Sequence, residues 1–336
     1  MNKGLPFVKT DLHIHLDGAV DPKTLFELGL ERDIDMPAKT LEEFTPFVIA
    51  EPDCKSVNEY LEKFALPTKI LQDKAALTRI AGELVERLDN RMLGYAEIRF
   101  APQIHTHKGL TQQDAIDAVL EGINNANRIN GIKTGLILCA MSFGDPEGNK
   151  AQNLETIELA GQYTGCGVNA VDLAGAERLY PLSDFSYVFK KARELGLSYT
   201  CHAGDSDGPS SVRTAVMEFG SRRIGHGHRV YDDPELCELV RDLGVTFEIC
   251  LTSNIQCDSQ PSYKLHPAKK MLDMGINVTL CTDNPVIAGV TIDSEYETAK
   301  KYAGFNDADL VKMSKNAINA AFISDEEKRV LQNIFK

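Results

Sequence analysis

The sequence has no apolar run long enough to cross a membrane, and it is poor in basic residues. No stretch of about 18 residues is apolar throughout, so no transmembrane helix is expected. Lys and Arg number 36 against 49 Asp and Glu, which gives a formal net charge of −13. Because the basic residues also form no long cluster, nucleic acid and anionic membranes are unfavourable partners. These shortages favour a neutral or cationic small molecule as the ligand.

Paired cysteines and a leader sequence are also missing. None of the eight cysteines belongs to a C-x-x-C pair, and residues 1–10 lack the apolar core of a signal peptide. We therefore expect a cytoplasmic protein whose thiols stay reduced, as small buried side chains. With 336 residues, the chain is long enough to fold around a large core without disulfides.

Eight short apolar runs alternate with helical patterns along the chain. Most are rich in Val, Ile, Leu or Phe, as expected for parallel strands covered on both faces. The predicted strands are Phe7–His13, Tyr95–Phe100, Thr134–Met141, Val168–Leu173, Leu197–His202, Arg223–His226, Val245–Cys250 and Val278–Thr282. Eight strands with helices between them fit a closed barrel better than an open sheet. The sequence therefore predicts an α/β fold, a (β/α)8 TIM barrel, as a single domain over residues 1–336.

Helices between these strands are marked by capping residues. Asp73 and Asp184 each precede an apolar stripe with spacings of three and four, and Gly196 follows the second stripe. Asp233 and Pro234 open a third helix. The interval after the first strand, about residues 20–93, is longer than a barrel connection requires. We expect a helical insertion there that covers the mouth of the barrel.

Histidine and aspartate recur at the carboxyl ends of the predicted strands. His13 and His15 end the first strand, and residues i and i+2 of a strand point to the same face. His202 ends the fifth strand, His226 the sixth and Asp283 the eighth. The carboxyl ends of barrel strands converge on one mouth, where active sites occur. We therefore expect these five side chains to share one site.

Such nitrogen and oxygen donors suit a divalent metal. Three imidazoles and one carboxylate, without thiolate, favour Zn²⁺ and less specifically other first-row metals. With a position left for water, the metal would lower the pKa of that water towards about 7. Each residue alone is a weak signal, because a His-x-His pair or a strand-end Asp often has only a structural role. Their common placement predicts one zinc ion per chain.

Other histidines are weaker candidates. His105 and His107 form a second His-x-His pair, which we expect in a solvated loop after the second strand. His266 stands beside Pro267 at a predicted helix start and is interpreted as structural. His228 is expected at the mouth without an assigned role.

Six short segments together resemble the adenosine deaminase family over nearly the full length. They are DLHIHLDG at residues 11–18, DLAG at 172–175, HAGD at 202–205, GHGH at 225–228, TSN at 252–254 and CTD at 281–283. Each is short, but their order and spacing are specific. The resemblance implies a zinc-dependent barrel that hydrolyses the exocyclic amine of adenosine, and of 2′-deoxyadenosine, to give inosine-type products and ammonia.

The resemblance also implies which residues bind the metal. His13, His15, His202 and Asp283 would hold the zinc ion. His226 would orient the metal-bound water and assist its deprotonation, before the resulting hydroxide attacks purine C6.

Substrate contacts follow from the same resemblance. The backbone N–H of Gly175 would donate to purine N3, and Asp17 would accept from the ribose 5′-hydroxyl, with His15 also among the substrate-binding residues. Asn284 would face purine N7. Many relatives have Asp at that position, but an amide donates to N7 without a pKa shift.

Asp205 departs from the family, which usually has Glu at this position. That acid would protonate purine N1, and such a transfer contributes about 10²–10⁴-fold to the rate. Asp is one methylene shorter, and a displacement of about 1 Å can cost about 10²-fold. We therefore expect Asp205 to be the proton donor in an enzyme that works below its potential.

Alternative functions stay open. Adenine or a 5′-modified adenosine could be the substrate, whereas no basic cluster for an AMP phosphate stands beside Asp17. A catalytically impaired, zinc-dependent purine nucleoside binder is the alternative outside the enzymes, and a generic metallohydrolase is a further one. The sequence leaves the oligomeric state open.

Overall fold

Eight parallel strands form the inner wall of the protein, whose computed structural model describes residues 8–54, 56–88, 93–130 and 133–333. The strands are β1 Lys9–His15, β2 Leu93–Phe100, β3 Lys133–Met141, β4 Val168–Ala174, β5 Cys201–Ala203, β6 Arg223–His226, β7 Thr246–Ile249 and β8 Asn277–Leu280. They pair in chain order as two four-stranded sheets, β1 to β4 and β5 to β8. Parallel bridges from Ile14 to Asp283 and from Val171 to Tyr199 join the two sheets. The predicted (β/α)8 barrel is thereby confirmed.

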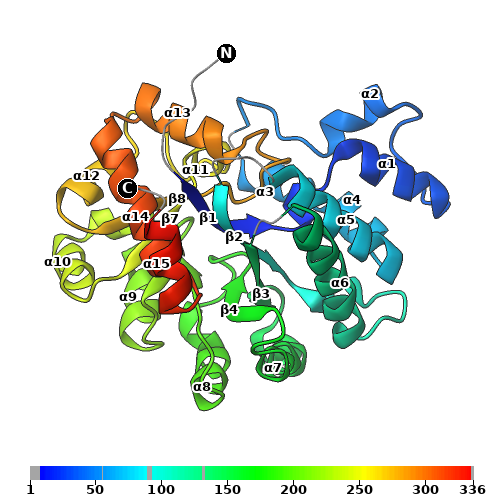
Figure 1. Cartoon of the computed structure of the whole chain (residues 1–336), viewed down its shortest axis with the longest axis horizontal. Helices are drawn as coiled ribbons and strands as arrows, with labels where there is room; N and C mark the ends of the chain where they lie inside the picture. Colours follow the sequence, from blue (N-terminus) through cyan, green and yellow to red (C-terminus); the bar gives the residue numbers. More distant parts are fainter. Residues whose placement is uncertain (1–7, 55, 89–92, 131–132, 334–336) are drawn as a thin grey trace.

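Helices surround this wall (Figure 1). The α-helices are α1 Pro22–Glu31, α2 Leu41–Phe44, α3 Val57–Glu62, α4 Ala65–Ile70, α5 Lys74–Leu88, α6 Gln112–Asn130, α7 Pro146–Gln162, α8 Ser186–Glu194, α9 Pro209–Met217, α10 Pro234–Asp242, α11 Leu251–Gln256, α12 Ala268–Asp273, α13 Ile292–Tyr302, α14 Asp307–Ala320 and α15 Asp325–Asn333. Short 3₁₀ helices are η1 Asp17–Ala19, η2 Thr45–Phe47, η3 Pro102–His105, η4 Leu182–Phe185 and η5 His228–Asp232. None of the helices in the described ranges is long and apolar enough to cross a membrane.

The strand boundaries differ from the predicted ones mainly at β1 and β5. Phe7, the predicted start of the first strand, lies outside the described residues, and β1 continues to His15 rather than ending at His13. β5 is shorter than predicted, although the preceding segment still pairs with β4 through Val171, whose N–H donates to Ser198 O and whose carbonyl accepts from Thr200 N. This is where the two half-barrels meet, so the segment forms a bridge instead of a regular strand.

Two of the three predicted helix starts are correct. Asp73 accepts from the N–H of Ala76 at 3.0 Å at the start of α5, and Asp233 accepts from the N–H of Leu236 at 3.0 Å at the start of α10. The start predicted at Asp184 is wrong, because that residue lies inside η4 and the α-helix begins at Ser186. A 3₁₀ turn is a common first turn before an α-helix.

The insertion between β1 and β2 is helical, as predicted. It contains η1, α1, α2, η2, α3 and α4, and α1 and α2 project to one side of the barrel (Figure 1). α5 then packs along α6 in the outer helical layer. One large apolar cluster joins both regions, including Leu25 and Ile70 of the insertion and Ile98 and Val171 of the strands. Full burial of such a side chain stabilises the fold by about 1.5–3 kcal/mol.

Candidate metal centre and active site

Four donor atoms converge at the mouth of the barrel. His13 Nε2 lies 3.2 Å from His15 Nε2, which in turn lies 3.3 Å from His202 Nε2. Asp283 Oδ1 lies 3.4 Å from the Nε2 atoms of both His13 and His15. Tetrahedral ligands at Zn–N distances of about 2.0–2.1 Å are about 3.3–3.4 Å apart. The four donors therefore fit a zinc-sized ion.

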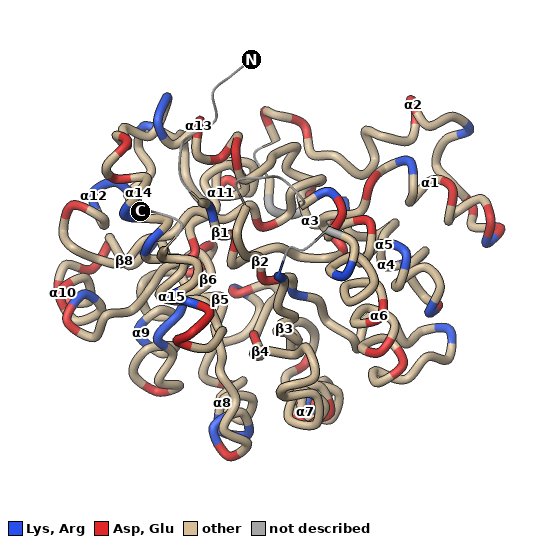
Figure 2. Tube along the Cα trace, viewed as in Figure 1, with Lys and Arg blue, Asp and Glu red and all other residues tan. Residues whose placement is uncertain are grey.

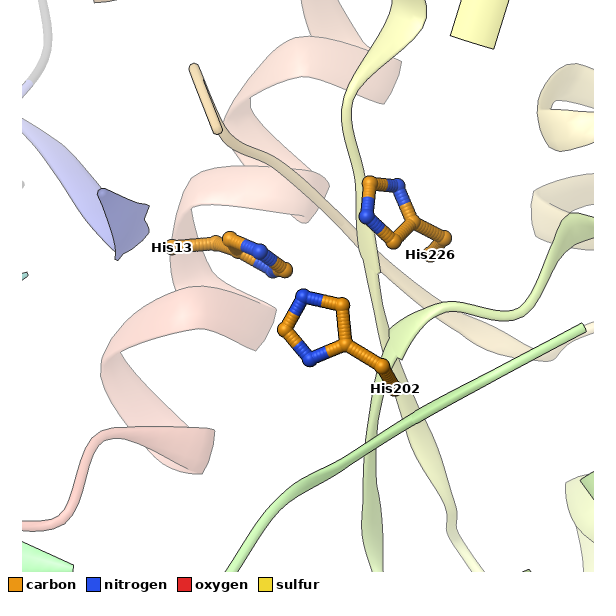
Figure 3. Close-up of side chains that lie close together, drawn as sticks. All are labelled: His13, His202 and His226. Carbon is orange, nitrogen blue, oxygen red and sulfur yellow. The ribbon is translucent and has the colours of Figure 1, made fainter. Parts of the chain in front are cut away.

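The barrel positions these side chains from strands that are distant in sequence. His13 comes from β1, His202 from β5 and His226 from β6, and the three rings point toward one another (Figure 3). The ring centroid of His226 is 5.0 Å from that of His13 and 5.3 Å from that of His202. A metal could also be held by His13, His202 and His226, whose donor atoms lie within 4.8 Å of one another. The structure thus brings together all five residues that were predicted to share a site.

Backbone strain is concentrated at the same mouth. His226 has φ of +59° and Asp283 has φ of +61°, in the left-handed region that non-glycine residues rarely adopt. Such conformations cost about 1–3 kcal/mol and are typical of functional sites. Gly225 meets a different constraint, because a Cβ there would lie 3.1 Å from the His13 ring and 3.3 Å from the His202 ring. The local backbone is therefore adapted to the histidine cluster.

Buried carboxylates orient two of the imidazoles from behind. His13 Nδ1 lies 2.8 Å from Glu248 Oε2, and His202 Nδ1 lies 2.9 Å from Asp172 Oδ2. With Nδ1 facing a carboxylate, each ring presents Nε2 to the cluster. A carboxylate behind a histidine ligand fixes the ring and makes the ligand more basic.

The negative charge of these carboxylates is balanced inside the barrel. Arg99 donates to Asp172 and to Glu248, each at 2.8 Å, and Arg223 pairs with both Glu248 and Glu97. All of these residues lie on the central strands, whereas other charged residues of both signs are spread over the outer helices (Figure 2). Removing one partner from such a buried network is strongly destabilising, because it leaves an uncompensated charge.

The protonation tendencies of the cluster suit metal binding. Burial lowers the pKa of His13 and of His15, so both imidazoles are neutral and have a free lone pair. Burial alone would raise the pKa of Asp283, but the hydrogen bond to His13 and the neighbouring imidazoles bring it well below its ordinary value. For His202, Asp172 outweighs burial and raises the pKa. A metal would compete with that proton.

Asn254 links the metal cluster to Asp205. The N–H of Ala268 donates to His266 Nδ1 at 3.2 Å, so Nε2 carries the proton of that ring. His266 Nε2 therefore donates to Asn254 Oδ1 at 3.2 Å, which fixes the orientation of the amide. Asn254 Nδ2 then donates to Asp205 Oδ1 at 2.8 Å and to His226 Nδ1 at 3.1 Å. This network places the proton of neutral His226 on Nε2.

The expected substrate-binding residues line the same mouth. Asp17 Oδ1 and Asn284 Oδ1 are buried and have no hydrogen-bond partner among the described residues. Burial raises the pKa of Asp17. Gly175 has φ of +122°, and a Cβ there would lie 2.9 Å from Ser142 Oγ. These positions hold unpaired polar groups of the kind that a ligand satisfies.

The expectation of a solvated loop for His105 and His107 is wrong for His105. That ring is completely buried, its Nδ1 lies 2.8 Å from the carbonyl of Leu71, and it senses the charge of Asp17. His107 is exposed. His228 is buried, with Nδ1 3.8 Å from Asp205 Oδ1, and His266 is a buried member of the Asn254 network rather than only part of a helix start.

Sequence reasoning gave no role to three carboxyl groups that the structure places around the site. Asp172 lies within the DLAG segment, so its motif was a usable signal. Glu248 had no signal, because an acidic residue inside an apolar strand shows its partners only in the folded barrel. Glu177 follows the DLAG segment and accepts from the backbone of Asp205.

Comparisons with known proteins agree with this geometry. A sequence profile of the adenosine deaminase family matches residues 8–336. An adenosine deaminase from Haemophilus ducreyi is 38% identical over 325 residues, which are 96% of this chain and 93% of the relative. An N6-mAMP deaminase from Arabidopsis has a TM-score of 0.85 and 27% identity over 98% of each chain. An adenine deaminase from Arthrobacter aurescens shares the fold, with a TM-score of 0.88 and 24% identity over 97% of each chain. By its sequence and by its fold, the chain belongs to the adenosine deaminase family.

Proposed function

We propose that this protein hydrolyses adenosine, and 2′-deoxyadenosine, with release of ammonia. The observation behind this proposal is the convergence of His13, His15, His202 and Asp283 at a mouth that also contains Asp205 and His226. The 38% identical relative named adenosine deaminase supports the substrate. The folds of deaminases with other substrates are equally similar, so the choice of adenosine rests on the residues and not on the fold.

We propose one zinc ion per chain at this cluster, held by the three Nε2 atoms and by Asp283 Oδ1. When bound, zinc supplies a water whose pKa is lowered towards about 7. Ser253 Oγ donates to Asp283 Oδ2 at 2.5 Å and leaves Oδ1 toward the histidines. The carboxylates behind His13 and His202 hold the rings in the orientation that this role requires.

The chain's own residues then position the purine and move protons. His226 Nε2–H donates to the oxygen that adds to C6, and so orients it. Asp205 gives its proton to N1 as negative charge develops there, which is general acid catalysis. Because Asn254 and Ser259 both donate to Oδ1 of Asp205, at 2.8 Å each, Oδ2 is the oxygen left to carry that proton.

Binding groups hold the rest of the substrate. The N–H of Gly175 donates to N3, Asn284 donates to N7, and Asp17 accepts from the 5′-hydroxyl near His15. A site that hydrogen-bonds a hydroxyl discriminates against a substrate that lacks it, because the buried group is then left unpaired. We further infer that residues 1–336 act as one domain. We place the protein in the cytoplasm, a proposal supported by the free thiols, six of which are buried.

The short acid favours a second candidate function. Asp205 is one methylene shorter than the family's usual Glu, so the protein could be a zinc-dependent purine nucleoside binder with impaired chemistry. A spectrophotometric assay of the zinc-loaded protein with adenosine, deoxyadenosine, adenine, AMP and methylthioadenosine separates these functions. We expect turnover of the first two substrates. Nucleoside binding with no release of ammonia from any substrate would support the binder and contradict the deaminase.

A further inference from the structure

Glu177 projects from the loop after β4 into the turn that carries Asp205. Its Oε2 atom accepts hydrogen bonds from the backbone N–H groups of Asp205, Ser206 and Asp207, at 3.1, 2.9 and 2.8 Å. Three successive N–H groups that point at one oxygen form an anion-binding nest. Glu177 therefore fixes the backbone of the turn from which the Asp205 side chain emerges.

The same side chain connects two loops that face one ring of the substrate. Glu177 lies two residues after Gly175, whose N–H is the proposed partner of purine N3, and it binds the backbone of Asp205, the proposed donor to N1. N1 and N3 belong to the same six-membered ring. The spacing between the two loops therefore decides whether both contacts form at once, and an acid one methylene short leaves little tolerance in that spacing.

We propose that Glu177 is a positioning residue for deamination, which sets the distance between the Gly175 N–H and the Asp205 carboxyl group and so makes the shorter acid usable. This proposal rests on the proposed function.

The environment of Glu177 agrees with such a role. Its other oxygen, Oε1, is buried and has no hydrogen-bond partner in the part of the chain that the structure describes. Burial and the nearby charge of Asp205 raise the pKa of Glu177. A buried oxygen without a partner costs stability, so a carboxyl group kept here at that cost is typical of a functional site rather than of simple packing.

Hydrogen–deuterium exchange tests the clamp directly. In Glu177→Ala, a peptide covering residues 205–208 should exchange at least about tenfold faster than in the wild type, because three protected N–H groups lose their acceptor. Glu177→Gln keeps one acceptor oxygen and should retain most of the protection. Glu218→Ala removes an exposed glutamate at the C-cap of α9 and serves as the matched control. Unchanged exchange in Glu177→Ala would overturn the proposal.

Kinetics then distinguish a positioning role from a merely structural one. With zinc content confirmed, Glu177→Ala should lower kcat for adenosine about tenfold or more while KM changes less than about threefold. The Ki of 1-deazaadenosine, which has carbon in place of N1, should change less than about twofold. Glu177→Gln should recover most of the activity, and Glu218→Ala should retain all of it.

Two results would contradict the positioning role. One is a kcat within twofold of the wild type in Glu177→Ala, and the other is a Ki for 1-deazaadenosine that rises as much as kcat falls, which would indicate general damage to the site. A wild-type protein that does not turn over adenosine would refute the proposed function itself. Exchange would still report the clamp in that case, but the catalytic role of Glu177 would be wrong.

Discussion

His13 Nδ1 lies 2.8 Å from Glu248 Oε2, and both side chains are completely buried. The contact crosses the barrel from β1 to β7 and directs Nε2 of His13 toward His15 and Asp283. Glu248 is also the shared partner of Arg99 and Arg223. One carboxylate therefore orients a candidate metal ligand and neutralises the charges beneath it.

Replacing Glu248 should weaken metal binding. Glu248→Gln keeps the shape of the side chain but removes the charge behind His13, so we expect affinity for zinc to fall about 10–100-fold. Competition with a chromogenic chelator measures the affinity, and Glu218→Gln is the exposed control. Since Arg99 and Arg223 lose a counter-charge, the variant should also unfold at a lower temperature. Unchanged zinc affinity in a folded variant would contradict the orienting role.

Metal occupancy should depend on the first His-x-His pair and not on the second. The double variant His13→Ala with His15→Ala removes two of four proposed donors, and we expect it to lose the zinc ion. His107→Ala changes an exposed histidine of the second pair and should keep one zinc per chain. Atomic absorption of the purified proteins gives the ratio. Full occupancy in the double variant would show that the metal, if present, is held elsewhere.

The length of the acid at residue 205 should control turnover. Asp205→Glu should raise kcat about tenfold or more, because even part of the general-acid contribution of about 10²–10⁴-fold would account for it. KM should change less, since the proton moves mainly in the transition state. Asp205→Asn should lose most activity and keep zinc, because the residue is not among the proposed ligands. A lower kcat in Asp205→Glu would mean that the turn held by Glu177 already suits the shorter acid.

Recognition of the ribose should depend on Asp17. Adenosine should have a higher kcat/KM than adenine, because the buried carboxyl group of Asp17 is paired only when a 5′-hydroxyl is present. Asp17→Ala should lower kcat/KM for adenosine about tenfold or more and leave that for adenine nearly unchanged. Parallel assays on both substrates provide the comparison. Equal losses on the two would place Asp17 away from the ribose.

The pH dependence of stability should contain a contribution from Glu295. Burial raises the pKa of this carboxyl group to about 7, against hydrogen bonds from Thr252. Its folded-state pKa is therefore above the unfolded value, so the protonated form is favoured in the fold and stability is lost as the pH rises from about 4.5 through about 7.

Glu295→Gln removes this titration and can keep the bond from the Thr252 hydroxyl. The stability of the variant relative to the wild type should increase by about 2 kcal/mol between pH 5 and pH 8. Urea unfolding of both proteins at the two pH values measures this difference. A constant difference between the proteins would show that Glu295 does not titrate in this range.

The order of apolar runs and strand-end histidines determined much of the outcome by itself. Period and length predict eight covered strands, and the carboxyl-end rule brings His13, His202 and Asp283 to one mouth without knowledge of any contact. The helical insertion follows from the length of the interval after His15. Local capping patterns placed α5 and α10 correctly, because an N-cap is a contact between residues two or three apart.

Only the tertiary structure decided which groups surround the candidate ligands. Glu248 and His13 are 235 residues apart, and no local pattern encodes a pair at that separation. Burial of His105 likewise depends on Leu71 in the insertion, so its loop position alone was misleading. The clamp of Glu177 on the turn of Asp205 joins two separate β–α loops. Such contacts depend on how strands and loops pack around a closed barrel, which is a property of the whole chain and not of any segment.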